Sequence, residues 1–405
     1  MNILNISTWD NEYFGFYLHQ HLKANGYNSR LAVFYKNSND VDTYLIGNFI
    51  TRRFDKRIVS FFERLFGINS IFPISGLTLM WKKYFMKSDI VHLHVIYGVS
   101  FFSILFLPFI SRIKKVVWTI HDSWIMTGHC VYPINCERWK TGCGNCPNLT
   151  LPICILWDST AIVWRLKRVL LKYSNVTLIA SPWLREQIKQ SPILSHFPCY
   201  TMIYGLNMTR FKIKDKKQCR DLFNIPMDAH VIAFRFMGEN DKLKGWVYIK
   251  EALGAMTLTK PTYIITTQMK GISKFLDKKF TCIELGFVPD SEMIVDVMNA
   301  ADLFLMPSEA ESYGMMAIES MACGTPVIVF EGTSLADIIH APNGGIAVPK
   351  SPDALMHAIE DLLNDHNKYD TIVKNGLDIV KNEYDAEKCV KVNVDVYKTL
   401  IDRST

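Results

Sequence analysis

Short apolar segments alternate with longer amphipathic segments along most of the chain. Apolar runs bounded by turn residues are typical of buried strands, and the amphipathic stretches between them are typical of helices. Strands are predicted at residues 2–6, 29–34, 90–94, 116–120 and 177–180 in the first half, and at residues 230–236, 262–266, 281–285, 303–306 and 327–330 in the second. Because strands that alternate with helices pair in parallel, the pattern predicts an α/β fold with two doubly wound, Rossmann-like domains in series.

The length and composition fit this arrangement. The 405 residues are enough for two domains with full cores, and 49% hydrophobic with 21% charged residues is a globular composition. The domain break is predicted near Gly205, where a lysine-rich run follows the last strand of the first half, giving domains at residues 1–205 and 206–383. Residues 1–6 read as a strand and not as a signal peptide, so we expect a cytoplasmic chain whose ten cysteines are mostly reduced.

Positive charge is concentrated in the first half of the chain. Residues 1–200 contain 22 Lys and Arg against 11 Asp and Glu, whereas residues 201–405 contain 23 against 28. A basic half joined to a mildly acidic half indicates that only the first half meets an anionic partner. Nucleic acid and an anionic membrane leaflet are the two candidates.

Three segments bear on that choice. Residues 49–66 and 162–172 mix basic and bulky apolar side chains at roughly helical spacing, as interfacial helices do, although an ordinary domain helix with a solvated basic face is the alternative for each. Residues 99–110 are very apolar but shorter than the about 20 residues of a membrane span, and Pro108 interrupts them, so we expect a buried helix there. We therefore expect a peripheral protein at the inner face of the cytoplasmic membrane, with no nucleic-acid partner.

A predicted strand leads into a predicted helix within residues 306–329. Pro307 ends the strand, and Gly314 opens a helix that a glycine-proline turn closes. The N–H groups of Gly314, Met315 and Met316 at the helix start, together with the helix dipole, would favour a phosphate.

Two carboxylates accompany this helix. Glu311 lies just before its start, and Glu319 lies near its middle. One carboxylate can address a sugar at the mouth of the helix, and the other can reach deeper groups such as ribose hydroxyls. Taken alone, two such residues are more often a helix-start Glu favoured by the dipole and a surface Glu.

The order of residues in this region changes that reading. The string Pro-Ser-x-x-Glu-x-Tyr-Gly, followed by Glu-Ser-Met-Ala-x-Gly-x-Pro-Val, resembles the Glu-x7-Glu signature of retaining glycosyltransferases of family 4, with Tyr313 for Phe and Ser320 for Ala. The resemblance implies the GT-B fold, in which two Rossmann-like domains face a central cleft and a C-terminal helix, here residues 384–405, crosses back to the first domain. It also implies that Glu311 lies by the donor sugar as a catalytic residue and that Glu319 lies by the ribose.

The same family implies further contacts in the second domain. Lys244 matches the lysine that pairs with the donor diphosphate during catalysis. The arginine that usually precedes it is absent, so a second cation is expected from Lys242 or Arg235. Phe287 and Val288 match the segment whose backbone meets the nucleotide base.

Two features of the first domain extend the resemblance. His121 and Asp122 end a predicted strand and match a His-Asp pair, which implies that His121 contacts sugar hydroxyls during catalysis and that Asp122 could orient its ring. A lone histidine after a strand is more often packed or at the surface, and for His94 a structural role is as plausible as a place in the cleft. Relatives have two glycines in the first loop near the diphosphate, whereas residues 9–15 contain only Gly15, which we expect to open the first helix.

Four cysteines form a separate cluster. Cys130, Cys136, Cys143 and Cys146 lie in a loop at about residues 128–147 with the spacing C-x5-C-x6-C-x2-C. Four thiolates suit tetrahedral zinc, and a similar insert occurs in relatives that make colanic acid, capsule or O-antigen; free or paired thiols are the alternative. Four cysteines leave no open position on the metal, so zinc would be structural, and we expect no cofactor to be required for catalysis.

The resemblance leads to one expected function and two alternatives. We expect a retaining glycosyltransferase that moves a sugar from a nucleoside-diphosphate sugar to a lipid-linked or oligosaccharide acceptor in bacterial surface polysaccharide synthesis. A GT-B epimerase or phosphorylase would fit the fold. The other alternative is a non-catalytic protein that binds nucleotide sugars or polyanions. A decayed catalytic site would favour it, and Glu239 in place of the usual arginine suggests such decay.

Overall fold

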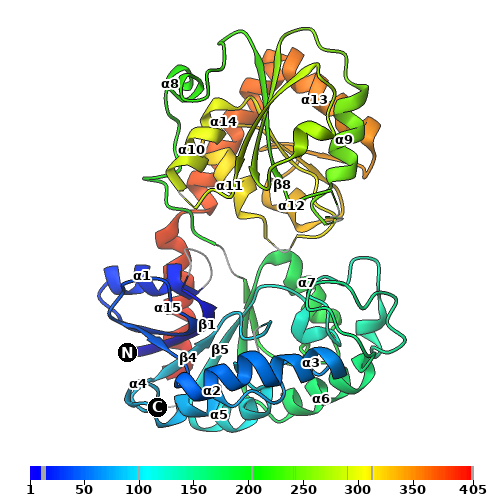
Figure 1. Ribbon diagram of the computed structural model, residues 1–405. Helices are drawn as coiled ribbons and strands as arrows, with labels where there is room; N and C mark the ends of the chain where they lie inside the picture. The colour runs from blue at the N-terminus through cyan, green and yellow to red at the C-terminus, as the bar shows by residue number, and fades with distance from the viewer. Residues whose placement is uncertain are drawn as a thin grey trace. The chain divides into compact units, whose positions relative to one another are not determined.

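The chain forms two compact units, Met1–Ile203 with Cys389–Thr405 and Tyr204–Lys388, in a computed structural model (Figure 1). The structure describes all residues except 11–14, 99–100, 202–203, 240, 242, 290, 312 and 403–405. Each unit has one parallel sheet connected by helices, which confirms the predicted α/β class and its two Rossmann-like domains. The central cleft stays a prediction.

The sheet of the first unit has seven strands in the order β3-β2-β1-β4-β5-β6-β7, all paired in parallel. The strands are β1 (Asn2–Trp9), β2 (Asn28–Tyr35), β3 (Thr43–Leu45), β4 (Ile90–Leu93), β5 (Lys115–Ile120), β6 (Val176–Ala180) and β7 (Cys199–Thr201). Every residue of β4 and β6 is buried, as expected for central strands with both faces covered.

The helices of this unit include one long interrupted helix. It consists of α2 (Phe49–Phe54), a π-helical turn η1 (Asp55–Val59) and α3 (Ser60–Phe66). The other helical elements are α1 (Gly15–Ala24), η2 (Ser75–Trp81), α4 (Lys83–Met86), η3 (Ile104–Phe106), α5 (Leu107–Ile113), η4 (Trp124–Met126), η5 (Arg138–Lys140), α6 (Thr160–Lys172), α7 (Pro182–Gln190) and α15 (Ala386–Asp402).

The C-terminal helix α15 packs against the first sheet. The hydroxyl of the buried Tyr397 lies 2.6 Å from His92 Nδ1 on β4, and Lys115 Nζ on β5 donates to the carbonyl of Leu400 at 2.7 Å. These contacts join the end of the chain to the unit that holds its beginning.

The sheet of the second unit has six strands in the order β10-β9-β8-β11-β12-β13, again all parallel. The strands are β8 (His230–Phe236), β9 (Thr262–Gln268), β10 (Phe280–Gly286), β11 (Leu303–Met306), β12 (Val327–Phe330) and β13 (Ile346–Val348). The helices are α8 (Lys216–Asp221), α9 (Trp246–Ala255), η6 (Ile272–Lys274), α10 (Ser291–Ala300), α11 (Met315–Ala322), α12 (Ser334–Ile338), α13 (Pro352–Asn364) and α14 (His366–Glu383).

Three strands were not predicted from the sequence, and one predicted helix is less buried than expected. The missed strands β3, β7 and β13 are sheet edges of three residues each, too short to show a periodicity. The predicted buried helix at residues 99–110 is wrong in part, because residues 101–103 are not helical and Phe109 is exposed on α5, whereas Leu107 and Ile110 are buried. Residues 99 and 100 of that segment lie outside the described residues.

Candidate active site

The candidate site in the second unit lies where the winding of the sheet reverses. From β8 the chain adds β9 and β10 on one side of the sheet, and it then adds β11, β12 and β13 on the other side. At such a switch point the loops that leave two neighbouring strands diverge, which leaves room for a ligand at the carboxyl ends of the strands. Here the loop after β8 carries Lys244, and the loop after β11 carries Glu311.

These two loops touch each other through their backbones. The N–H of Glu309 donates to the carbonyl of Leu243 at 2.8 Å. Gly245 precedes α9 with φ +74°, and a Cβ added to it would lie 1.9 Å from the carbonyl oxygen of Pro307. Only glycine fits such a contact, because a side chain would clash with rigid backbone and would strain a left-handed residue. The contact fixes the spacing between the strand-end loops.

The two residues expected to be catalytic in this unit pair with each other. Lys244 Nζ lies 2.5 Å from Glu311 Oε2, and the two side chains are 25% and 13% exposed. A diphosphate that approaches Lys244 would compete with the Glu311 carboxylate for the ammonium group. The pair therefore combines a cation suited to phosphate with a carboxylate suited to sugar hydroxyls.

Helix α11 starts beside this pair, as the sequence predicted. Gly314 is its N-cap with φ +78°, and a Cβ there would lie 2.1 Å from Leu335 Cδ2. The first N–H groups of a helix have no partner within the helix, so those of Met315 and Met316 can bind an anion. Glu319 is 1% exposed on this helix, which excludes the surface Glu that was the alternative reading.

The other residues predicted to contact the donor are spread over several segments of the second unit. Arg235 lies next to the end of β8, and in the described part of the chain its buried Nε has no hydrogen-bond partner. Lys242, the other candidate cation, lies outside the described residues. Phe287 is 71% exposed and Val288 is partly buried just after β10, the outermost strand and two strands away from β8.

A second group of predicted residues meets at the switch point of the first sheet, between β1 and β4. Gly15 begins α1, as expected, and a Cβ on it would lie 2.7 Å from Cδ2 of His94, so this glycine allows the helix to approach the ring. His121 follows β5, and its Nε2 lies 3.4 Å from His94 Nδ1. Residues 11–14 of the first loop lie outside the described residues.

Burial favours the neutral form of the histidines in this group and of the adjacent His92. Burial lowers the pKa of His94 to about 3, and it also lowers the pKa values of His92 and His121 well below their usual range. Neutral imidazoles can donate or accept hydrogen bonds with sugar hydroxyls. His92, by contrast, is held between Tyr397 (2.6 Å) and Thr119 Oγ1 (2.7 Å), which makes it structural.

The neighbours of His121 and His94 were only partly predictable. Asp122 is partly buried, and desolvation raises its pKa to about 7, while its carboxylate accepts a hydrogen bond from the N–H of Trp124 at 2.8 Å. An orienting role of Asp122 for His121 stays a prediction. Asn5 on β1, which the sequence did not single out, lies with its Oδ1 3.2 Å from His94 Nε2.

The chain contains an Asp-x-Asp pattern at Asp40 and Asp42, although no metal motif of this kind was expected from the sequence. Both carboxylates bind Lys23 Nζ, at 2.8 Å and 2.6 Å, and His19 Nε2 lies 3.1 Å from Asp40. The carboxylates of Asp40 and Asp42 therefore already have partners among the side chains of the same unit.

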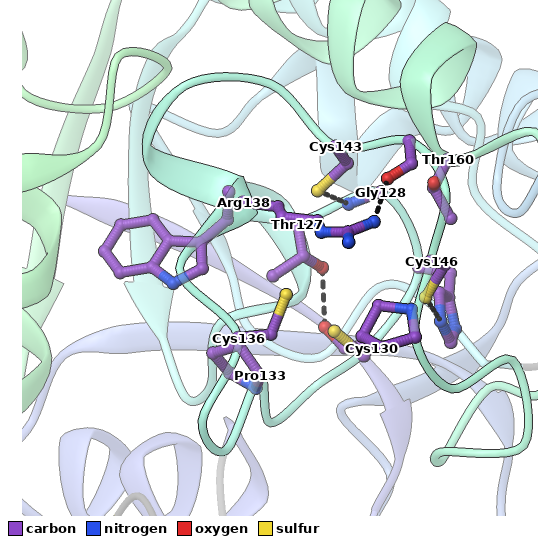
Figure 2. A pocket seen from close by; sticks show the side chains of 13 residues that line it. Thr127, Gly128, Cys130, Pro133, Cys136, Arg138, Cys143, Cys146 and Thr160 are labelled. Carbon is purple, nitrogen blue, oxygen red and sulfur yellow. Dashed lines mark hydrogen bonds between the residues drawn. The ribbon is translucent and has the colours of Figure 1, made fainter.

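The four clustered cysteines line one small pocket of the first unit, in the loop that follows β5 (Figure 2). Figure 2 shows their sulfur atoms distributed around the pocket. None of the residues proposed above for sugar transfer lines it.

Sequence comparison relates the second unit to a known family. Residues 266–378 match the family Glycosyl transferases group 1. The chain is 34% identical over 210 residues to an uncharacterized glycosyltransferase of Methanocaldococcus jannaschii, a match that covers 49% of this chain and 53% of that protein. It is also similar to an Escherichia coli protein that carries the name of a colanic acid biosynthesis glycosyl transferase, WcaC. The two chains are 23% identical over 267 residues, which cover 63% of each. The chain thus spans only about half to two thirds of the length of these relatives.

Structure comparison extends over both units. The chain is similar to the crystal structure of Anabaena HepE in complex with UDP and glucose, with a TM-score of 0.68 and 14% identity. The match covers 99% of this chain and 100% of the Anabaena chain. At this identity the likeness establishes the fold.

Proposed function

We propose that this chain, which carries a glycosyl transferases group 1 domain in a GT-B fold, is a retaining glycosyltransferase of bacterial surface polysaccharide synthesis. It would move a sugar from a nucleoside-diphosphate sugar to a lipid-linked glycan acceptor at the inner face of the cytoplasmic membrane. The observation that carries the proposal is the Lys244–Glu311 pair beside the start of α11.

The donor would bind in the second unit. Lys244 and the N–H groups of Met315 and Met316 would stabilise the charge that develops on the leaving diphosphate. Glu311, released from Lys244 when the phosphate arrives, would then accept hydrogen bonds from the sugar, and the buried Glu319 would hold the ribose. The UDP and glucose in the similar Anabaena structure support a donor of this class.

The first unit would contribute the neutral histidine His121 to the reaction. We propose front-face attack by the acceptor hydroxyl, as the family resemblance implies, so that the transferred sugar keeps its anomeric configuration.

Donor binding can be tested before the acceptor is known. A panel of UDP-, GDP- and dTDP-sugars should include one class that raises the melting temperature, because a ligand that binds only the folded state stabilises it. Lys244→Ala should reduce that shift, whereas Lys278→Ala, a change at an exposed lysine of the same unit, should leave it intact. A panel without any shift would contradict a nucleotide-sugar donor.

The membrane part of the proposal rests on the surface of the first unit. Among the described residues, all exposed large hydrophobic side chains except six lie between residues 41 and 173. They include Phe49 and Trp157, which are 76% and 70% exposed. Patches of this kind mark interaction sites in soluble proteins.

The helix from α2 to α3 points most of its apolar side chains outward and its acids inward, and Val59 is buried. Asp55 is fully buried and accepts hydrogen bonds from the N–H groups of Ile74 and Ser75 at 3.0 Å and 2.7 Å. Glu63 is buried as well and accepts from the N–H of Ile71 at 3.0 Å. These bonds fix the helix with its phenylalanines exposed: Phe49, Phe54, Phe61, Phe62 and Phe66.

Neighbouring helices extend the same surface. Lys114 at the end of α5 donates to the carbonyl of Met86 at the end of α4, and α5 in turn packs on α6. The N–H of Leu156, just before α6, donates to the carbonyl of Arg64 on α3. The exposed apolar side chains on these elements are Met86, Leu105, Phe109, Ile113, Leu156, Trp157, Ile162 and Val169.

Exposed cations are interleaved with these side chains, which favours an anionic leaflet over a neutral apolar partner. They are Arg53, Lys56, Arg57, Arg64, Arg112, Arg165, Arg168 and Lys172. Two basic residues of the predicted interfacial segments do not belong to this surface. Arg52 donates to the carbonyl of Phe34 at 2.5 Å, and Lys167 is fully buried. No described helix has the length and apolarity of a membrane-spanning segment.

Vesicle binding tests this surface. The protein should sediment with vesicles that contain phosphatidylglycerol at low salt, and it should be released at high salt. The triple change of Arg53, Arg57 and Arg64 to Ser should weaken binding roughly a hundredfold, at about 1 kcal/mol per cation. The matched change of Lys217, Lys278 and Lys374 to Ser, in the second unit, should have little effect.

The apolar contribution needs its own pair of variants. Phe61→Ser with Phe62→Ser should weaken binding at every salt concentration, whereas Leu222→Ser with Met227→Ser, which are exposed on the second unit, should not. Binding to neither kind of vesicle would contradict the membrane assignment, and equal binding to neutral and anionic vesicles would contradict the preference for an anionic leaflet.

A further inference from the structure

The pocket lined by cysteines has room for an ion but not for an organic ligand. It holds about 20 Å³ of free volume, roughly that of one water-sized sphere. Its walls include Cys130, Cys136, Cys143 and Cys146 (Figure 2). His129 also lines the pocket. Soft sulfur ligands around so small a space favour a metal such as Zn²⁺.

The backbone between two of these cysteines brings both sulfurs to the same pocket. Gly144 (φ +136°) and Asn145 (φ +47°) let the chain reverse between Cys143 and Cys146, so that both sulfurs reach the same pocket. The N–H of Gly128 donates to Cys143 Sγ at 3.3 Å. A hydrogen bond of this kind stabilises a thiolate relative to a thiol.

A buried cation lies next to the same sulfurs. Lys167 on α6 is fully buried, its Nζ donates to the carbonyls of Trp124 (2.6 Å) and Thr127 (3.0 Å), and it lies 3.8 Å from the centre of the Trp124 ring. Burial lowers the pKa of Lys167 to about 7, and negative charge on Cys143, Cys130 or Asp122 counteracts this shift. A buried ammonium group is costly unless negative charge compensates it, and thiolates would add to the charge that the Asp122 carboxyl can supply.

We propose that Cys130, Cys136, Cys143 and Cys146 bind one Zn²⁺ as a structural tetrathiolate site and that Lys167 compensates its negative charge. Binding would release four thiol protons to solvent, and the complex of Zn²⁺ with four thiolates would carry two negative charges. Within the described residues, no three His, Cys, Asp or Glu side chains are arranged to hold an ion as they stand. The sulfurs would therefore turn further into the pocket that they already line.

Metal analysis tests this site independently of sugar transfer. Protein purified without a metal-affinity tag or chelator should contain about one zinc per chain. Cys143→Ser and Cys146→Ser should each lose the zinc, whereas Cys282→Ser, in the second unit, should keep it. Because a cysteine variant can fail to fold, the unaltered protein should also be exchanged with Co²⁺, which should produce thiolate-to-cobalt charge-transfer absorption and the visible bands of tetrahedral cobalt.

Two further variants test the details. Lys167→Met should make zinc transfer to a colorimetric chelator faster, because the uncompensated site is less stable. His129→Gln should keep the zinc. Loss of zinc from this variant would indicate that the imidazole is a ligand, since His129 Nε2 lies 3.4 Å from Cys146 Sγ, and it would overturn the tetrathiolate assignment. Protein without metal whose four cysteines alkylate as free thiols or are linked in disulfides would overturn the proposal. Zinc retained by both cysteine variants would do the same.

Discussion

Glu311→Gln should lower the rate of sugar transfer by roughly 10²- to 10³-fold while the protein remains folded. Losses of this size follow removal of a group that stabilises the transition state through a preorganised electrostatic contact. The carboxylate of Glu311 is mostly buried and lies beside the start of α11, where the sugar and the phosphate of the donor would meet. Single-turnover transfer, measured with the melting temperature of the same sample, separates lost chemistry from lost structure.

Glu309→Gln is the matched control for this change. Glu309 lies two residues earlier in the same loop, but its carboxylate accepts a hydrogen bond from Tyr248 (2.7 Å) and pairs with Lys350 (3.3 Å). We expect this variant to transfer at close to the unaltered rate. Equal rates for both variants would show that Glu311 has no special role.

Lys244→Ala should lower kcat/KM for the donor by roughly 10- to 100-fold, because charge-assisted hydrogen bonds contribute about 1.5–3 kcal/mol. Part of the loss should appear in kcat, since the charge on the diphosphate grows as the sugar departs. Initial rates over a range of donor concentrations give both quantities. Adding Arg235→Ala to this variant would show whether a second cation contributes, because independent contributions multiply.

A charge swap distinguishes this role from simple stabilisation of the fold. Lys244→Glu combined with Glu311→Lys restores an ion pair, so its melting temperature should lie closer to that of the unaltered protein than those of the single variants. Transfer should remain lost, because the cation and the carboxylate would exchange places relative to the donor. Recovery of transfer in the swapped protein would mean that the pair serves only to hold two loops together.

Much of the second unit could be predicted because its signals are local. A buried strand of four residues, a proline after it and a glycine before a helix defined β11 and α11 to within one residue. The pairing of Lys244 with Glu311 was less accessible, because the two residues are far apart in the sequence and meet only when β8 and β11 become neighbours. Likewise, Gly245 has a role only through its contact with Pro307.

In the first unit, periodicity predicted helices correctly but could not tell which face would be covered. The basic and apolar pattern of residues 49–66 predicted a helix, and the helix is present. The phenylalanines face outward because Asp55 and Glu63 are buried against the loop at residues 71–75. Lys167 read as one more surface cation, yet helix α6 turns it into the core. Such outcomes depend on hydrogen bonds between separate segments, from 8 residues apart for Glu63 and Ile71 to 43 for Lys167 and Trp124, for which a single sequence carries no pattern.

The most direct test of the central claim is a transfer assay with the unaltered protein and its Glu311→Gln variant. Both would be supplied with the nucleoside-diphosphate sugar that raises the melting temperature, together with a lipid extract containing polysaccharide precursors. We expect the unaltered protein to release nucleoside diphosphate and to form a glycolipid in which the new linkage keeps the anomeric configuration of the donor. The variant should do neither at a comparable rate. An inverted linkage, or donor that is bound but neither transferred nor hydrolysed, would contradict the central claim.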